Sequence, residues 1–241
     1  MSPTVNTVAV YAVSIADGDF DREKARAFAW MAPDEREKYE RFRFERHRLE
    51  FAISRFMLRS VLGDALQQSP ASLCFSRHKN GKPFLQADSA PSFNLTHTDD
   101  FAALVIDAPG LLLGIDAEPA DRMFDPILLS EAFNDEEVAL IDDKTNGDAS
   151  PVSLWTAKEA FLKQIGAGLT ISPKRVHIRT NETGVAGAVL DGHYQSHCRF
   201  HFATVARRRI CVATEQSEPP ELRLYRDGAW RREPIEWAVR P

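Results

Sequence analysis

Two acidic side chains close a short apolar run, in the segment Gly114-Ile115-Asp116-Ala117-Glu118. If this run is a β-strand, Asp116 and Glu118 project from the same face, because side chains two residues apart do so. Neighbouring carboxylates repel each other, which opposes the ionisation of both unless a cation lies between them. A hard divalent ion with oxygen ligands, Mg²⁺ or Mn²⁺, fits this pattern. The alternative is a solvated strand end, where two acids need no ion.

A third carboxylate belongs to the segment Trp155-Thr156-Ala157-Lys158-Glu159-Ala160-Phe161-Leu162-Lys163. Its pattern predicts a helix, on which Glu159 and Lys163 share one side because residues four apart are neighbours. The simpler interpretation is an apolar face with an ordinary Glu–Lys ion pair. If Glu159 instead faces Asp116 and Glu118, three carboxylates converge on one ion. Lys163 is then placed to bind a phosphate that the metal also contacts.

The segment Asn94-Leu95-Thr96-His97-Thr98 is predicted to form a turn between two strands. A hydroxyl and an imidazole in a strand-end loop are suitable phosphate contacts, and His97 could also carry protons. The alternative for a single histidine is a structural role.

Three further histidines, His193, His197 and His201, are spaced by four residues. On a helix this spacing would align three imidazoles for zinc. The turn signal at Asp191-Gly192 and the alternating residues after His201 predict strands instead. In a strand the outer two histidines are more than ~12 Å apart, so we expect no metal site there.

The elements that must position these residues follow from periodicity and turn signals. We expect a helix over 45–62 that Gly63 ends, and a second helix over 151–165. Strands are expected over 7–14, 93–95, 101–106, 110–118, 185–190, 198–205 and 210–214. The order strand, helix, strands occurs twice, so the predicted fold is α+β with two similar α/β halves. The predicted domains are an N-terminal half (1–109), a C-terminal half (110–216) and a C-terminal tail (217–241).

Composition and charge exclude several classes of protein. The 241 residues are 44% hydrophobic and 27% charged, which is typical of a globular protein. The apolar runs are shorter than the ~20 residues that span a bilayer, and no secretory signal is apparent. The net charge of −5 argues against a general nucleic-acid binder. Three cysteines without CxxC spacing indicate a reducing cytoplasm.

The charge is unevenly distributed along the chain. Residues 36–59 hold eight Arg or Lys against four Glu, a balance of +4. Residues 116–148 hold eleven Asp or Glu against two basic residues, a balance of −9. A basic segment can bind a phosphate-bearing ligand and an acidic one a hard cation. The alternative is that both segments are solvated helix faces.

The order of these motifs, with Asn80-Gly81-Lys82-Pro83 before them and Gly166-Ala167-Gly168-Leu169 after them, resembles the 4′-phosphopantetheinyl transferases of the surfactin-synthetase-activating (Sfp) type. Each motif alone is weak, and their succession over residues 34–170 is specific. The resemblance implies the fold of that family, in which two similar halves are related by a pseudo-twofold axis. It also implies transfer of the phosphopantetheine arm of coenzyme A to a serine of an apo acyl- or peptidyl-carrier protein, with release of adenosine 3′,5′-bisphosphate.

The resemblance also implies roles for individual residues. Asp116, Glu118 and Glu159 hold Mg²⁺, with Mn²⁺ as the alternative ion, and Lys163 contacts the coenzyme A diphosphate. The catalytic residues are Glu159, Asp116 and Lys163, and the base is Glu159 or a metal-bound water. The other residues expected to bind coenzyme A are Lys38, Lys82, Thr96, His97, Lys158 and one of Arg46 and Arg48.

The chain departs from the family pattern at two of these places. Glu50 precedes Phe51 where relatives commonly have arginine, which leaves the choice between Arg46 and Arg48 open. Thr96 replaces the family's serine and keeps the hydroxyl group.

The sequence therefore predicts a Mg²⁺-dependent transferase that acts as a cytoplasmic monomer, without nucleic-acid or membrane partners. One alternative is a coenzyme A or carrier-protein binding module without catalysis. Another is an unrelated Mg²⁺-dependent nucleotidyl or phosphoryl transferase.

Overall fold

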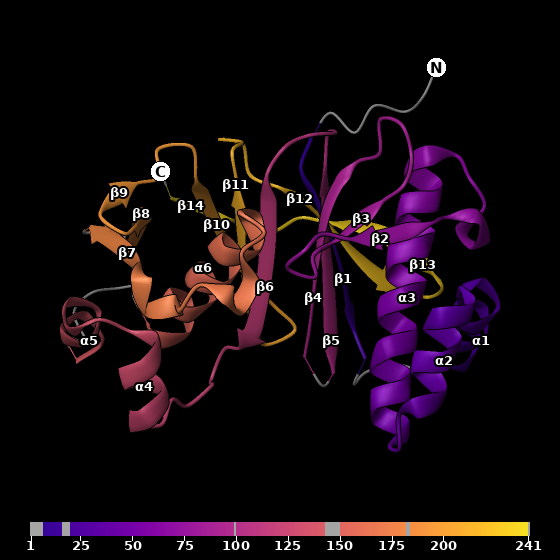
Figure 1. Cartoon of the computed structure of the whole chain (residues 1–241), viewed down its shortest axis with the longest axis horizontal. Helices are drawn as coiled ribbons and strands as arrows, with labels where there is room; N and C mark the ends of the chain where they lie inside the picture. Colours follow the sequence, from indigo (N-terminus) through magenta and orange to yellow (C-terminus); the bar gives the residue numbers. More distant parts are fainter. Residues whose placement is uncertain (1–6, 16–19, 99, 143–149, 182–183, 241) are drawn as a thin grey trace. The chain divides into compact units, whose positions relative to one another are not determined.

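Helices and mostly antiparallel strands occur in separate runs along the chain, so the predicted α+β class is confirmed (Figure 1). The computed structural model describes residues 7–15, 20–98, 100–142, 150–181 and 184–240. They form two compact units. The first contains the described residues within 1–77, 83–110 and 221–234, and the second those within 78–82, 111–220 and 235–241.

The first unit contains a five-stranded sheet in the order β13-β12-β1-β5-β4. Its strands are β1 (Ala9–Ser14), β4 (Ser92–Thr98), β5 (Phe101–Asp107), β12 (Glu221–Arg226) and β13 (Ala229–Glu233). All seven residues of β5 are buried, and α3 packs against this strand. The helices are α1 (Asp21–Trp30), α2 (Pro33–Arg41) and α3 (Glu45–Leu66), and a small hairpin pairs β2 (Phe75–Arg77) with β3 (Pro83–Leu85).

Helix α3 continues past the residue that was expected to end it. Gly63 is buried within the helix, where a Cβ atom would lie 2.9 Å from the carbonyl oxygen of Gln68. The helix ends instead before Gln67, whose φ of 54° is left-handed. Gly63 therefore serves close packing, and the prediction that it stops the helix is wrong.

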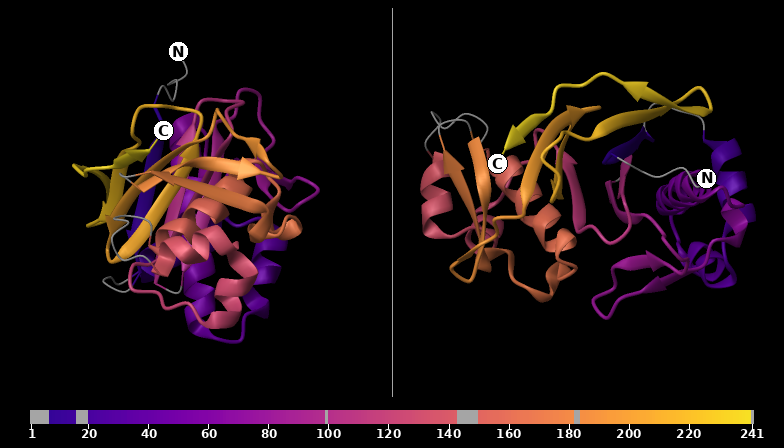
Figure 2. Two further views of the ribbon diagram at one scale, coloured as in Figure 1. Left: turned by 90° about the vertical axis from the view of Figure 1, so that its left-hand side faces the viewer. Right: turned by 90° about the horizontal axis from the view of Figure 1, so that it is seen from above.

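The C-terminal tail is not a separate part of the chain, which corrects the predicted third domain. Strand β12 pairs in parallel with β1, and β13 pairs antiparallel with β12 (Figure 2, right view). The last strand, β14 (Ala238–Arg240), pairs with β10 of the second unit. The residues that follow the proline pair at 219–220 complete two sheets.

The second unit has a four-stranded sheet in the order β14-β10-β11-β6 and a three-stranded sheet β7-β8-β9. Helix α6 (Pro151–Gln164) packs against β6 (Leu113–Pro119) and β11 (Arg208–Thr214). The other elements are α4 (Pro126–Ala132), α5 (Asp135–Asp142), β7 (Val176–Asn181), β8 (Gly184–Leu190), β9 (His193–Tyr194), β10 (Arg199–Val205) and short 3₁₀ turns at Pro70–Ser72, Gly168–Thr170 and Pro173–Arg175.

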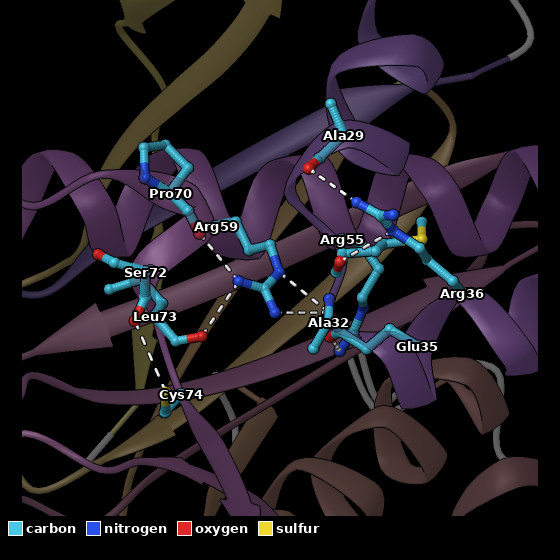
Figure 3. A network of polar contacts seen from close by, with 11 residues as sticks. Ala29, Ala32, Glu35, Arg36, Arg55, Arg59, Pro70, Ser72, Leu73 and Cys74 are labelled. Carbon is cyan, nitrogen blue, oxygen red and sulfur yellow. Dashed lines mark hydrogen bonds and ion pairs between the residues drawn. The ribbon is translucent and has the colours of Figure 1, made fainter.

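A buried ion pair ties α2 to α3 in the first unit (Figure 3). Arg59 of α3 donates to Glu35 Oε2 from Nη2 at 2.5 Å and from Nε at 3.0 Å. Its Nη1 donates to the carbonyl oxygens of Pro70 and Leu73, and Arg55 Nη1 donates to Glu35 Oε1 at 3.2 Å. All three nitrogens of the Arg59 guanidinium and both carboxylate oxygens of Glu35 are thus hydrogen-bonded, as a buried charge requires.

None of the helices in the described ranges combines the length and hydropathy that a membrane-spanning segment requires.

Candidate active site

The two acids of the first motif lie near the end of β6. Asp116 is 5% exposed, and the side chain of Glu118 is 17% exposed. The strand is paired along its length with β11, Asp116 opposite Cys211 and Glu118 opposite Arg209. This pairing fixes the alternation that places the two carboxylates on one face.

Helix α6 carries the second motif and faces the same strand. Lys163 Nζ donates to Asp116 Oδ1 at 2.7 Å and to the carbonyl oxygen of Ile115 at 3.1 Å. Glu118 Oε1 accepts from Trp155 Nε1 at 3.0 Å and also pairs with Arg122. Residues from both ends of α6 thus reach the acids of β6.

Burial and the charges of neighbouring acids raise the pKa values of two of the three carboxyl groups. Burial raises the pKa of Glu159, and the charges of Asp116 and Glu118 raise it further against the effect of Lys163. Burial and Asp116 also raise the pKa of Glu118, against the opposing effects of Arg122 and Trp155. Each raised pKa reflects a carboxylate held close to another in a site with little water.

Asp116, Glu118 and Glu159 offer the type of donor atom that a hard divalent ion prefers. All three supply carboxylate oxygens, and Glu159 Oε1 is buried with no hydrogen-bond partner among the described residues. Within that part of the chain, however, no three acidic, histidine or cysteine side chains are already gathered as a metal-binding group. In this structure Asp116 bonds Lys163, and Glu118 bonds Trp155 and Arg122.

Lys158 does not belong to this site, which corrects its assignment to coenzyme A binding. Its side chain is 0% exposed. Its Nζ donates to Glu137 Oε2 at 2.5 Å and to the carbonyl oxygens of Ala132 and Pro173. All three ammonium protons are thus used inside the second unit, so Lys158 has a structural role.

Lys82 is also bonded entirely to backbone, although a nucleotide contact was expected. Its Nζ donates to the carbonyl oxygens of Leu113 (2.9 Å), Lys163 (2.7 Å) and Gln164 (3.3 Å). An ammonium group has three donors, and here each has an acceptor.

The first unit has a basic pocket of about 430 Å³. Its lining includes Lys38, Arg55, Arg77 and His97, together with one acid, Glu50. Lys38 and Arg55 both lie 5.2 Å from the ring centre of Phe51. Burial lowers the pKa of Lys38, and the charges of Arg77 and Arg55 lower it further. Cations that repel one another in a concave site favour an anionic ligand.

The sequence predicted part of this pocket. Lys38 and His97 line it, whereas Thr96, Arg46 and Arg48 do not. Thr96 and His97 lie within strand β4 and not in a turn, so Thr96 is buried while His97 is exposed.

Arg55 and Arg77 were missed as candidate ligands of this pocket. Arg55 is half of the pattern Arg55-x-x-x-Arg59, which one side of a helix presents together. That spacing was the available signal. The spacing does not distinguish the two arginines: Arg55 lines the pocket, whereas Arg59 is buried against Glu35.

A larger cavity of about 650 Å³ in the same unit contains none of the predicted residues. Its arginines are already engaged. Arg223 donates to Glu221 at 2.6 Å, and Arg26 lies over the rings of Trp30 and Phe56. The smaller pocket, with its clustered cations, is the better anion site.

Two protein-family models match consecutive stretches of the chain. The model of the 4′-phosphopantetheinyl transferase superfamily matches residues 112–214. The model of the N-terminal region of 4′-phosphopantetheinyl transferases matches residues 20–108.

Several curated relatives are similar over most of the chain. A phosphopantetheinyl transferase of Thraustochytrium sp. is 28% identical, covering 88% of this chain and 79% of its own. The 4′-phosphopantetheinyl transferase Sfp of Bacillus subtilis is also 28% identical, covering 84% of this chain and 90% of its own. HetI of Nostoc sp., another 4′-phosphopantetheinyl transferase, is 32% identical over 58% of this chain and 62% of its own.

The two family models and these relatives together identify the chain as a member of the 4′-phosphopantetheinyl transferase family. It is an enzyme, and its family implies coenzyme A and a carrier protein as substrates.

Proposed function

We propose that the protein is a Mg²⁺-dependent 4′-phosphopantetheinyl transferase of the Sfp type. It transfers the phosphopantetheine arm of coenzyme A to a serine of an apo acyl- or peptidyl-carrier protein and releases adenosine 3′,5′-bisphosphate. The observation that carries this proposal is the approach of α6 to β6, which brings Lys163 to Asp116 and places Glu159 within the electrostatic influence of both acids.

Asp116, Glu118 and Glu159 are the proposed Mg²⁺ ligands, with Mn²⁺ as an alternative ion. A bound divalent ion supplies charge neutralisation for a diphosphate and for the leaving phosphate. Phosphoryl transfer depends on positioning and on electrostatic stabilisation more than on covalent help from the protein. The negative balance of residues 116–148 suits a cation, whereas Lys163 suits the diphosphate that the cation accompanies.

Glu159 is the proposed general base. In the transfer, the serine oxygen bonds to the phosphorus that carries pantetheine, and the bond from this phosphorus to the oxygen of adenosine 3′,5′-bisphosphate breaks. Glu159 accepts the serine proton. A carboxylate with a raised pKa is a stronger base than an exposed one, and Glu159 Oε1 is buried without a hydrogen-bond partner among the described residues.

The basic pocket of the first unit is proposed to bind the nucleotide end of coenzyme A. Lys38, Arg55, Arg77 and His97 supply positive charge for the 3′-phosphate, and Phe51 supplies an aromatic surface. Arginine is suited to this task because its planar fork matches phosphate oxygens.

The protein is proposed to act as a cytoplasmic monomer, with no nucleic-acid or membrane partner. Its net charge of −5 supports the absence of nucleic-acid binding. Sedimentation of the purified protein measures the oligomeric state directly.

Mass spectrometry of apo carrier proteins, incubated with coenzyme A and Mg²⁺, tests the proposed reaction. We expect the wild type to add the mass of phosphopantetheine to at least one acyl or peptidyl carrier. Glu159→Gln should reduce the rate at least about 100-fold, a typical cost of losing a general base. Glu131→Gln, on the exposed surface of α4, is the matched control and should keep wild-type rates.

Three outcomes contradict the proposal. Coenzyme A or carrier binding without any mass shift indicates a non-catalytic binding module. Activity with ATP but none with coenzyme A indicates an unrelated phosphoryl or nucleotidyl transferase. Wild-type turnover by Glu159→Gln removes Glu159 from the reaction.

A further inference from the structure

The side chain of Lys82 joins two elements that are far apart in the sequence. Its three hydrogen bonds end on Leu113, the first residue of β6, and on Lys163 and Gln164, the last two residues of α6. The last carbonyl groups of a helix lack the usual partners inside the helix. A lysine ammonium also suits the negative end of the helix dipole.

The surrounding contacts reinforce the same junction. Asn80, two residues before Lys82, donates from Nδ2 to the carbonyl oxygen of Gly166 at 3.1 Å. Gln164 Nε2 donates to the carbonyl oxygen of Leu112 at 3.3 Å. Residues 78–82 thus belong to the second unit through contacts with the end of α6.

The strand and the helix meet there without an intervening side chain. A Cβ atom on Gly114 would lie 2.0 Å from the carbonyl oxygen of Ala160 and 2.5 Å from the backbone nitrogen of Gln164. Asp116 lies two residues further along β6, and Glu159 and Lys163 flank this contact on α6. A small slide of the helix along the strand therefore moves Lys163 and Glu159 relative to Asp116.

We propose that Lys82 is a positioning residue, which fixes the register of α6 on β6 and thereby the geometry of Asp116, Glu159 and Lys163. It does so without touching coenzyme A, because all three of its donors are bonded to backbone carbonyls. The inference rests on the proposed function, since it assigns those three residues to the reaction. Misplacement of catalytic groups by about 1 Å can lower the rate on the order of 100-fold.

Steady-state kinetics of Lys82→Met test the inference, with saturating carrier and varied coenzyme A. We expect kcat to fall about 10- to 100-fold while KM for coenzyme A stays within about threefold of wild type. Lys82→Arg, which keeps a cationic donor, should recover at least part of the lost kcat. Lys79→Met removes an exposed lysine of the same segment and should behave as wild type.

Hydrogen exchange provides a readout that is independent of activity. In Lys82→Met, backbone amides over 159–167 should exchange faster, whereas those of β5 should not change. If Lys82→Met does not fold, Lys82→Gln replaces it, and the same changes should be smaller because the amide keeps two donors.

Two results would overturn the inference. A rise in KM for coenzyme A with unchanged kcat makes Lys82 a substrate ligand. Wild-type kinetics and exchange show that the junction does not depend on it. Inactivity of the wild-type protein on every carrier contradicts the proposed function instead, and the exchange measurement then still reports on the junction.

Discussion

Lys163 Nζ lies 2.7 Å from Asp116 Oδ1, across the packing of α6 on β6 and 47 residues away in the sequence. This contact joins the residue proposed to bind the diphosphate to a residue proposed to bind the metal. The side chain of Lys163 is 25% exposed, so the same ammonium group also reaches solvent. It can thus balance the charge of Asp116 and attract a phosphate.

Replacing Lys163 with methionine keeps most of the length of the side chain and removes its charge. We expect kcat/KM for coenzyme A to fall about 10- to 100-fold, since hydrogen bonds to charged groups contribute about 1.5–3 kcal/mol. Steady-state transfer assays measure the effect. Lys174→Met, at an exposed lysine of the same unit, is the control. An unchanged kcat/KM would separate Lys163 from the phosphate.

Arg55 and Arg46 distinguish the structural assignment of the basic pocket from the sequence-based one. Arg55→Met should raise KM for coenzyme A about tenfold or more, because Arg55 lines the pocket. Arg46→Met should leave KM nearly unchanged, because Arg46 is exposed outside that lining.

Dephospho-coenzyme A, which lacks the 3′-phosphate, provides the matching substrate. If Arg55 binds the 3′-phosphate, Arg55→Met should raise KM less for dephospho-coenzyme A than for coenzyme A. Because Arg55 also bonds Glu35, thermal unfolding of the variant shows whether the fold persists at the assay temperature. A large effect at Arg46 and none at Arg55 would reverse the assignment.

Gly114→Ala tests the direct contact between β6 and α6. The added Cβ would meet the carbonyl oxygen of Ala160 at 2.0 Å, so the helix must move or the fold must lose stability. We expect a loss of about 1–3 kcal/mol in the free energy of unfolding, as overpacking typically causes. The transfer rate should fall by more than the smaller fraction of folded protein explains. Denaturant unfolding measures the loss of stability, and steady-state kinetics measures the loss of activity.

Gly192→Ala is the comparison for that variant. Gly192 has a φ of +83° and open space around it, so alanine costs about 1 kcal/mol through backbone strain alone. Its activity per folded molecule should not change. Equal activity losses in the two variants would contradict a special role for the Gly114 contact.

The Glu35 carboxylate should account for part of the stability that the first unit loses at acidic pH. Burial alone raises its pKa, but the bonds from Arg59 and the Ala32 amide and the charge of Arg55 outweigh burial and lower the pKa. A lowered pKa in the folded state stabilises the fold above the pKa of the unfolded chain, about 4.3. That stabilisation is lost as the pH falls through the lower, folded-state value.

Glu35→Gln should therefore be less stable at pH 7, by about 3 kcal/mol for a broken buried pair. It should also lose less of its stability than the wild type when the pH is lowered from about 5 to 3. Urea unfolding at several pH values measures both effects. Parallel curves for the two proteins would show that the Glu35 carboxylate is not responsible.

The sequence was sufficient to predict α6, β6 and the acids they carry. Pro151 at the helix start, the two glycines after its end and the apolar face are local signals, and the helix spans Pro151–Gln164 as expected. The sequence also indicated Lys38 and His97, which line the basic pocket. It failed for Thr96, because pairing with β5 places that residue inside strand β4. It failed for the tail, because β12 pairs with β1, which lies more than a hundred residues earlier in the sequence.

The sequence by itself determined which residue types are present and which of them share a strand face or a helix side, because those relations have a fixed period. Only the tertiary structure decided which lysines are available to a ligand. Lys82 bonds to three backbone carbonyls and Lys158 is fully buried against two carbonyls and Glu137, whereas Lys163 bonds Asp116 and Ile115 and also reaches solvent. Every residue type presents the same carbonyl group, so a lysine that will bond to backbone leaves no mark in the sequence that distinguishes it from one that will bind a phosphate.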